Sequence, residues 1–100
     1  MIMNAKPVGE IMENIKLICL LDGTKLISSI EEVSADIGEP DCKLTKPYQF
    51  GTPIQGLSPT LEAWLSDFTS QDIFMIHSDK ILTLSDPKPT LLEKYQSLTK

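Results

Sequence analysis

One segment constrains the fold of this chain more than any other: residues 15–33, IKLICLLDGTKLISSIEEV. Residues 15–21 place apolar side chains on both faces of an extended chain, which is typical of a strand buried largely on both sides. Asp22-Gly23 follows, and this pair is one of the strongest short hairpin signals. Residues 25–33 return as a second strand, whose half-polar pattern suits a position near solvent or near a subunit contact. The segment therefore predicts an antiparallel hairpin.

The chain up to residue 85 reads as further short strands separated by turn residues. Residues 34–41 are a loop, with Gly38 and Pro40 as breakers. Residues 42–50 read as a third strand, in which Pro47 implies an edge position or a β-bulge. Residues 73–76 (IFMI) and 81–84 (ILTL) are two more strands, joined by a tight turn at residues 77–80.

Residues 61–68, LEAWLSDF, fit two patterns. Leu61, Trp64, Leu65 and Phe68 share a helical face, yet Leu61, Ala63 and Leu65 also alternate as in a strand. We favour the strand, because of the family resemblance given below, and a helix is the alternative.

The two ends of the chain are expected to be helical. Pro7 can open a short helix that runs to Asn14, so residues 1–14 are predicted to be a helix or an arm. Residues 90–98 form a short amphipathic pattern within a tail, 86–100, and Leu91, Leu92, Tyr95 and Leu98 lie on one side of it. A chain of 100 residues has room for one core, so we expect a single domain over 1–100, with its β part at 15–85.

The charged residues limit the kinds of partner. The net charge is −5, and all nine basic residues are Lys. Arg supplies the bidentate grip on phosphate and guanine that most sequence-specific nucleic-acid binders use. Any nucleic-acid function must therefore depend on Lys, backbone groups and stacking.

The chain has two cysteines, Cys19 and Cys42, which do not amount to a disulfide framework. We expect both to be reduced and Cys19 to be a small core residue. No apolar stretch approaches the roughly 18 residues of a membrane helix. We therefore expect a cytoplasmic protein without a membrane partner.

No group of residues has the types and spacing that indicate a catalytic site. His77 is the only histidine, and no Asp, Ser or Cys stands at a spacing that identifies a catalytic partner for it. One His and two separated Cys give no metal-binding pattern. We expect no enzyme activity, no metal and no cofactor. Exposed aromatic side chains could stack on bases, and Trp64, beside a loop, is the first candidate.

The order of strands resembles the Sm-like (LSm) family of small β-barrels. Residues 16–33, KLICLLDGTKLISSIEEV, look like the first family motif, in which a hydrophobic strand meets an acidic-Gly turn and a second strand follows. Residues 76–84, IHSDKILTL, look like the second motif: Ile76 matches its Ile, while His77 and Ser78 stand where the family has Arg and Gly. The chain is also similar to small Sm-like proteins encoded by T4-like phages of marine cyanobacteria, which implies a phage origin.

This resemblance implies a mainly β fold: a small, five-stranded, strongly bent antiparallel Sm-like barrel with short N-terminal and C-terminal helices. Residues 61–68 fall where the family's long fourth strand begins. Sm-like subunits pair the edge of the fourth strand with the fifth strand of a neighbour, so the partner would be the chain itself, in a closed ring of about five to seven subunits. The implied subunit interface consists of Ile73, Phe74, Met75, Ile76, Ile81, Leu82, Thr83 and Leu84.

The resemblance also implies single-stranded RNA as a partner at the pore of the ring. In the family, RNA is held by the third loop and by the Arg-Gly turn. The matching positions are Asp41 in the third loop and His77, Ser78 and Lys80 in the turn. The third loop carries acidic side chains that would repel phosphate, whereas His77 and Lys80 could attract RNA, and repetition around a ring multiplies a weak contact.

Two hypotheses follow. The first is a ring that binds RNA at its pore. The alternative is a ring component that contacts a protein partner or has a structural role, without RNA, which the acidic charge and the missing Arg favour.

Overall fold

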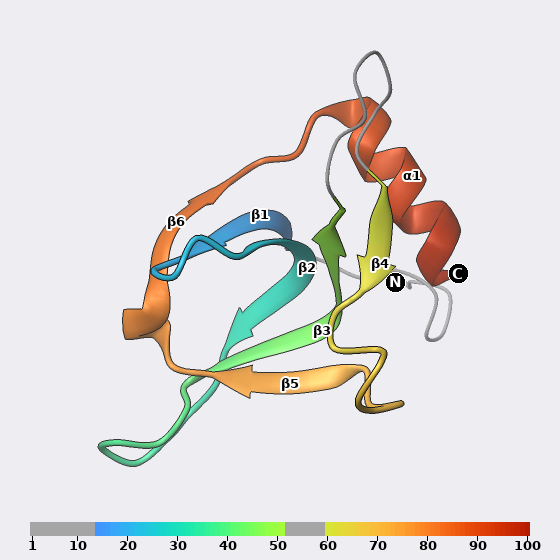
Figure 1. Ribbon diagram of the computed structural model, residues 1–100. Helices are drawn as coiled ribbons and strands as arrows, with labels where there is room; N and C mark the ends of the chain where they lie inside the picture. The colour runs from blue at the N-terminus through green and yellow to red at the C-terminus, as the bar shows by residue number, and fades with distance from the viewer. Residues whose placement is uncertain (1–13, 52–59) are drawn as a thin grey trace, which may run out of the picture.

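The computed structural model describes residues 14–51 and 60–100, drawn in Figure 1. The strands are β1 (Ile15–Leu20), β2 (Lys25–Glu32), β3 (Cys42–Phe50), β4 (Leu61–Ala63), β5 (Ile73–Ile76) and β6 (Ile81–Ser85). A single 3-10 turn, Ser78–Lys80, joins β5 to β6, and the helix α1 (Pro89–Thr99) follows. The N-terminal helix or arm expected over residues 1–14 lies, apart from Asn14, outside the described residues.

All strand pairs of the described residues are antiparallel, and the fold is mainly β as expected. The strands are ordered β4-β3-β2-β1-β6, and β5 pairs with the first half of β3 while β4 pairs with its second half. Within residues 14–51 and 60–100, β5 and β6 do not pair with each other, so the sheet is open. Figure 1 shows the sheet curving from β6 over β1 and β2 to β3 and β5.

The hairpin of β1 and β2 forms as the Asp-Gly signal predicts. Gly23 has a φ of 93°, a value that disfavours residues with a side chain, and its N–H donates to the Leu20 carbonyl at 2.9 Å. The Asp22 carboxylate accepts the Thr24 N–H at 2.9 Å. These contacts close the turn and set the register in which Cys19 faces Lys25.

Strand β3 contains the bulge that Pro47 implies. Ile27 pairs with Tyr48 and Ser29 with Thr45, so Lys46 and Pro47 together oppose the single residue Ser28. Lys46 has a φ of 53°, the left-handed conformation that the first residue of one type of bulge adopts. The strand is not at an edge, because it pairs with β2 on one side and with β4 and β5 on the other.

The prediction of a strand over 61–68 is right only for its first three residues. After Ala63 the chain turns, and Leu65 takes a φ of 62°. The Ser66 N–H donates to the Ala63 carbonyl and the Phe68 N–H to the Leu65 carbonyl, so neither a strand nor a helix continues. Phe68, which the helical pattern placed inside, is 86% exposed. The expected fourth strand is thus divided into β4 and β5.

The core lies on the concave side of the curved sheet. Its buried members are Ile18, Leu26, Ile30, Cys42 and Leu44. Both cysteines are free thiols, but the core cysteine is Cys42 and not Cys19, which is only half-buried. Strand β1 is also less enclosed than its sequence suggests, since Ile18 is its one buried residue. The reason is that β1 pairs with the short strand β6, whose residues beyond Ile81 are exposed.

Helix α1 covers the bulge of β3, close to the predicted span of 90–98. Tyr95 is fully buried beneath it, and its hydroxyl donates to the Lys46 carbonyl at 2.7 Å. The ring of Tyr95 meets that of Tyr48 edge-on, with 5.7 Å between the centroids. Toward the end of the helix Thr99 is buried, whereas Leu98, predicted on the inner side, is 47% exposed.

Candidate functional site

Two of the four residues expected to contact RNA, Asp41 and Ser78, are hydrogen-bonded to each other. The Ser78 N–H donates to Oδ1 of Asp41 at 2.7 Å, and the Ser78 hydroxyl donates to Oδ2 at 2.8 Å. Asp41 ends the loop between β2 and β3, and Ser78 begins the 3-10 turn after β5. We call this pair the Asp41–Ser78 clasp; it joins the third loop to the turn that the second motif predicted.

The clasp fixes the charge of its carboxylate. The hydrogen bonds from the Ser78 backbone and hydroxyl lower the pKa of Asp41 from its ordinary value of 3.8, and His77 nearby lowers it further. Asp41 is therefore ionised at neutral pH with both oxygens engaged. These two hydrogen bonds hold the turn at Ser78 against the end of the third loop.

The other two expected residues, His77 and Lys80, lie at the rim of a hollow. Its walls are apolar and come from Leu20, Leu21, Met75 and Ile76. Lys80 is exposed and His77 half-buried, and the Lys80 carbonyl accepts the Leu21 N–H at 2.9 Å, which ties the turn to the end of β1. Asp22 also lines this hollow, so an imidazole, an ammonium and a carboxylate border its apolar walls.

The eight expected interface residues divide by the direction of their side chains. Ile73 and Met75 on β5 are 44% and 45% exposed, and Leu82 and Leu84 on β6 are 64% and 47% exposed. Thr83 is exposed as well. Phe74, Ile76 and Ile81 instead pack against the core. On β5 the exposed residues alternate with two that pack against the core, whereas on β6 only Ile81 packs inward and the residues after it are exposed.

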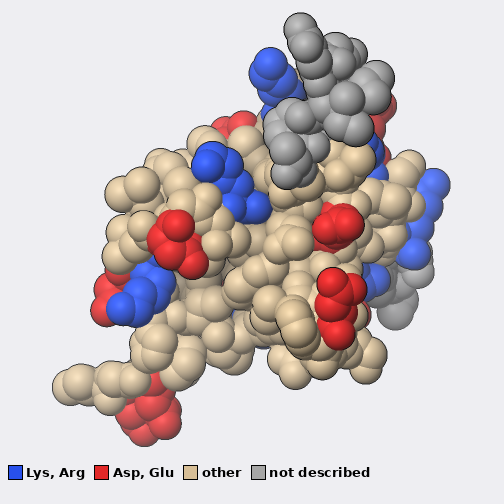
Figure 2. Space-filling view, viewed as in Figure 1, with Lys and Arg blue, Asp and Glu red and all other residues tan. Residues whose placement is uncertain are grey.

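The other carboxylates of the third loop, Asp36 and Glu39, lie in a separate turn. Asp36 and Glu39 belong to a turn closed by the Glu39 N–H on the Asp36 carbonyl at 3.0 Å, with Gly38 at a φ of 89°. Ile37 within that turn is fully exposed. Figure 2 shows this loop as a protrusion at the lower left that bears acidic but no basic side chains.

Comparison with protein families finds a match. A family described as "Family of unknown function (DUF6561)" matches residues 13–100, which is almost the whole chain. The chain belongs to the DUF6561 family. A search of curated proteins finds no match.

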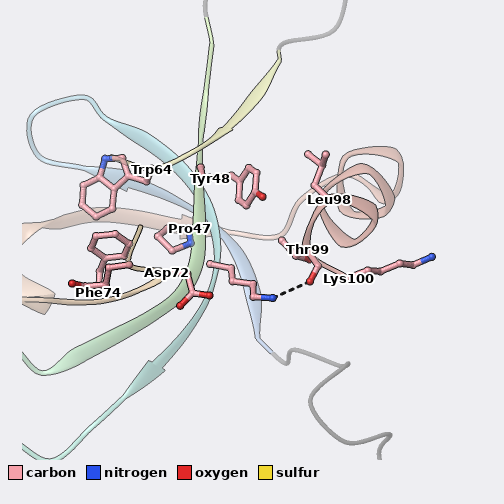
Figure 3. A pocket seen from close by; sticks show the side chains of 11 residues that line it. Pro47, Tyr48, Trp64, Asp72, Phe74, Leu98, Thr99 and Lys100 are labelled. Atoms are coloured by element: carbon pink, nitrogen blue, oxygen red, sulfur yellow. Dashed lines mark hydrogen bonds between the residues drawn. The ribbon is translucent and has the colours of Figure 1, made fainter. Parts of the chain in front are cut away.

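A second hollow of this DUF6561 protein was not anticipated from the sequence. It lies between the bulge of β3, the turn after β4 and the end of α1, as Figure 3 shows. Trp64, which sequence analysis named as a candidate for base stacking, forms one wall together with Phe74. Their ring centroids are 5.3 Å apart, and the angle between the ring planes is 54°. The other lining residues come from four separate segments of the chain, which no sequence pattern brings together. The aromatic residues of one wall were the only part of this hollow that sequence analysis considered for binding.

Metal and membrane features can be stated for the described part of the chain. Within residues 14–51 and 60–100, no three His, Cys, Asp or Glu side chains gather in a way that could hold a metal ion. In the same ranges, no helix has the length and apolar character needed to cross a membrane.

Proposed function

We propose that this protein is a subunit of an Sm-like homo-oligomeric ring, in which the outer edge of β5 pairs with the outer edge of β6 of the next subunit. The strand pairing supports this proposal, because β5 pairs only with β3 and β6 only with β1 among the described strands, so each of the two strands expected to meet across subunits has one unpaired edge. The 3-10 turn between them also stands where the second motif was recognised.

The observation that carries the proposal is the apolar surface of the two open edges. Leu82 and Leu84 on β6 and Ile73 and Met75 on β5 present exposed apolar side chains. Natural proteins usually protect an open strand edge with charges, prolines or bulges, since its unpaired N–H and C=O groups invite pairing. None of these four positions is charged, which suits edges that a neighbour covers.

Pairing of β5 with β6 joins two different edges, so the contact is heterologous. A heterologous contact repeats from subunit to subunit and ends only when the rotation closes into a ring. Closure pairs the free edges of β5 and β6 and buries apolar surface that a domain of 100 residues can hardly bury alone.

The molar mass in solution tests this proposal directly. Size-exclusion chromatography with light scattering is expected to give one species of about five to seven subunits, the range that the family resemblance implies. A monomer at every concentration measured would contradict the ring.

The pore is the proposed site for single-stranded RNA. His77 and Lys80 stand beside the apolar hollow of Leu20, Leu21 and Met75, and a ring would bring several copies of this rim together. Ser78 and Asp41 would act by holding the turn in place.

Replacing both His77 and Lys80 with Ala is expected to weaken binding of oligouridine and to flatten its salt dependence, because fewer counterions are released per bound strand. Fluorescence anisotropy over a series of salt concentrations measures both quantities. Lys88→Ala, at the start of α1, is the matched control. If the double variant binds as the unchanged protein does, this site assignment is wrong.

The second candidate function is a ring that binds a protein and no RNA, and the third loop favours it. Ile37 is fully exposed within a turn that carries Asp36 and Glu39, and such a surface repels phosphate while offering an apolar contact. Affinity purification before and after nuclease treatment separates the two functions: a partner that persists after nuclease supports this candidate, and loss of every partner contradicts it.

A further inference from the structure

The third loop is a closed protrusion with an apolar tip. The Val33 N–H donates to the Asp41 carbonyl at 3.0 Å at its base, and the Glu39 N–H donates to the Asp36 carbonyl at 3.0 Å at its tip. Ile37 stands at this tip and is fully exposed. Among the residues that the structure describes, no hydrogen bond or ion pair engages the carboxylates of Asp36 and Glu39. The loop thus holds an apolar side chain, flanked by two free carboxylates, out of the molecule.

The hollow beside His77 and Lys80 has the complementary character. Its walls are mostly apolar, and its volume of about 450 Å³ gives room for the tip of a turn. Within the described residues, no hydrogen bond or ion pair engages the Lys80 ammonium. Asp22 also lines the hollow, but its carboxylate already accepts the Thr24 N–H at 2.9 Å. A group that suits this hollow is therefore apolar, with a carboxylate beside it for the ammonium.

The proposed junction brings the third loop of one subunit to the hollow of the next. Every described strand pair is antiparallel, and a junction of the same kind sets the start of β6, Ile81, opposite the end of β5, Ile76. At that end of β5, Ile76 pairs with Cys42, the first residue after the third loop, and Figure 1 shows the loop extending beyond β5. At that end of β6, Ile81 pairs with Leu20, which lines the hollow. The loop and the neighbour's hollow thus lie at the same end of the junction.

We propose that Ile37 of each subunit inserts into the hollow of the next subunit of the ring. Asp36 and Glu39 then face the rim that carries Lys80 and His77. The occupant is a second copy of this chain, because tip and hollow are complementary in charge and each recurs once per subunit, as a heterologous contact requires. The contact rests on the proposed ring and adds to its β5–β6 pairing. Oligouridine at the same rim would compete with the loop.

Chemical crosslinking tests the placement of the loop. A chain with Ile37→Cys and Leu21→Cys has one thiol at the tip and one in the wall of the hollow, where Leu21 is 58% exposed. A short bismaleimide is expected to join neighbouring subunits and to give a ladder of covalent oligomers on a denaturing gel. Ile37→Cys with Leu98→Cys is the matched control, because Leu98 is exposed on α1 and does not line this hollow. Both chains keep Cys19 and Cys42, so they share the same background.

Ile37→Ser tests the contribution of the tip to assembly. Loss of one buried Ile side chain is expected to weaken each junction about tenfold, so the ring comes apart at a higher concentration on dilution. Light scattering over a dilution series measures this concentration. Phe68→Ser is the matched control, since Phe68 is also exposed and does not line the hollow. Because Ile37 is fully exposed in the single chain, Ile37→Ser is expected to leave the urea midpoint of the dissociated subunit unchanged.

The two measurements separate this contact from the ring itself. A ladder for the Leu21 pair only, together with weaker junctions in Ile37→Ser, supports the contact. A ring of the unchanged protein without that ladder, with an equal ladder for the Leu98 pair, or with junctions that Ile37→Ser leaves equally tight overturns the contact and leaves the ring. A monomer of the unchanged protein at every concentration overturns both.

Discussion

At the scale of single residues, the Asp41–Ser78 clasp is the contact that gives the predicted site its shape. One carboxylate accepts two hydrogen bonds from one residue, and in doing so joins the end of a loop to a turn 37 positions away. The sequence offered Asp41 and Ser78 as two separate contacts for RNA. Their mutual satisfaction leaves His77 and Lys80 as the groups that remain available to a ligand.

The clasp predicts a dependence of stability on pH. The folded pKa of Asp41 lies below the ordinary value of 3.8, so the folded state favours the ionised carboxylate. The contribution is therefore complete above that ordinary value and is lost as the pH falls through the lower, folded pKa. Asp41→Asn is expected to lower the denaturant midpoint at neutral pH, and the difference from the unchanged protein is expected to shrink in acid.

Urea unfolding at neutral pH and below about pH 3 measures this difference. Asp36→Asn, an exposed carboxylate of the same loop, is the control and is expected to unfold like the unchanged protein at both values. A difference that stayed constant down to the acid limit would show that the carboxylate charge is not the cause.

At the scale of elements, the sequence predicted local structure correctly where a single residue restricts the conformation or hydrogen bonding of the backbone. Asp22-Gly23 predicted the hairpin because Gly23 adopts the positive φ that the turn needs. Pro47 predicted an edge position or a bulge because it lacks the N–H of a regular ladder position, and the structure has the bulge. The helix was predicted from the spacing of Tyr95 and its apolar neighbours, and Tyr95 is the residue that the helix buries.

Sequence patterns failed to predict the structure where contacts between distant segments determine it. Over residues 64–68 the apolar pattern allowed either regular structure, but the Trp64 N–H bonds to the Pro47 carbonyl and the chain then turns at Leu65. Local periodicity contains no information about that contact. The hollow beside Trp64 is unpredictable for the same reason, since Lys46, Asp72 and Leu98 come together only when the bulge, the turn and α1 are assembled.

At the scale of the whole molecule, β5 and β6 are the two strands whose free edges the proposed ring pairs across subunits. Each of β5 and β6 has one unpaired edge, and each packs some residues against the core while exposing other apolar residues. A chain of 100 residues with both edges exposed in this way has little protection against association. The proposed ring requires β5 of one subunit to meet β6 of the next.

Two variants, each with one charged edge, answer that question. Leu82→Glu is expected to disable the β6 edge and Met75→Glu the β5 edge, because burial of an unpaired carboxylate costs several kcal/mol. Leu98→Glu on α1 is the control, since Leu98 is exposed to a similar degree as Met75 but lies on neither edge. Light scattering is expected to show each edge variant as a monomer and the control as the full assembly.

A mixture of the two edge variants then distinguishes a heterologous junction from a symmetric one. If β5 pairs with β6, the Leu82→Glu chain keeps a working β5 edge and the Met75→Glu chain keeps a working β6 edge, so the mixture forms one junction and stops at a dimer. If β6 instead paired with β6, the Met75→Glu chain would dimerise by itself. A heterodimer in the mixture with monomers in each separate sample is the only pattern that the proposed ring permits, because only unlike edges can repeat around a closed axis.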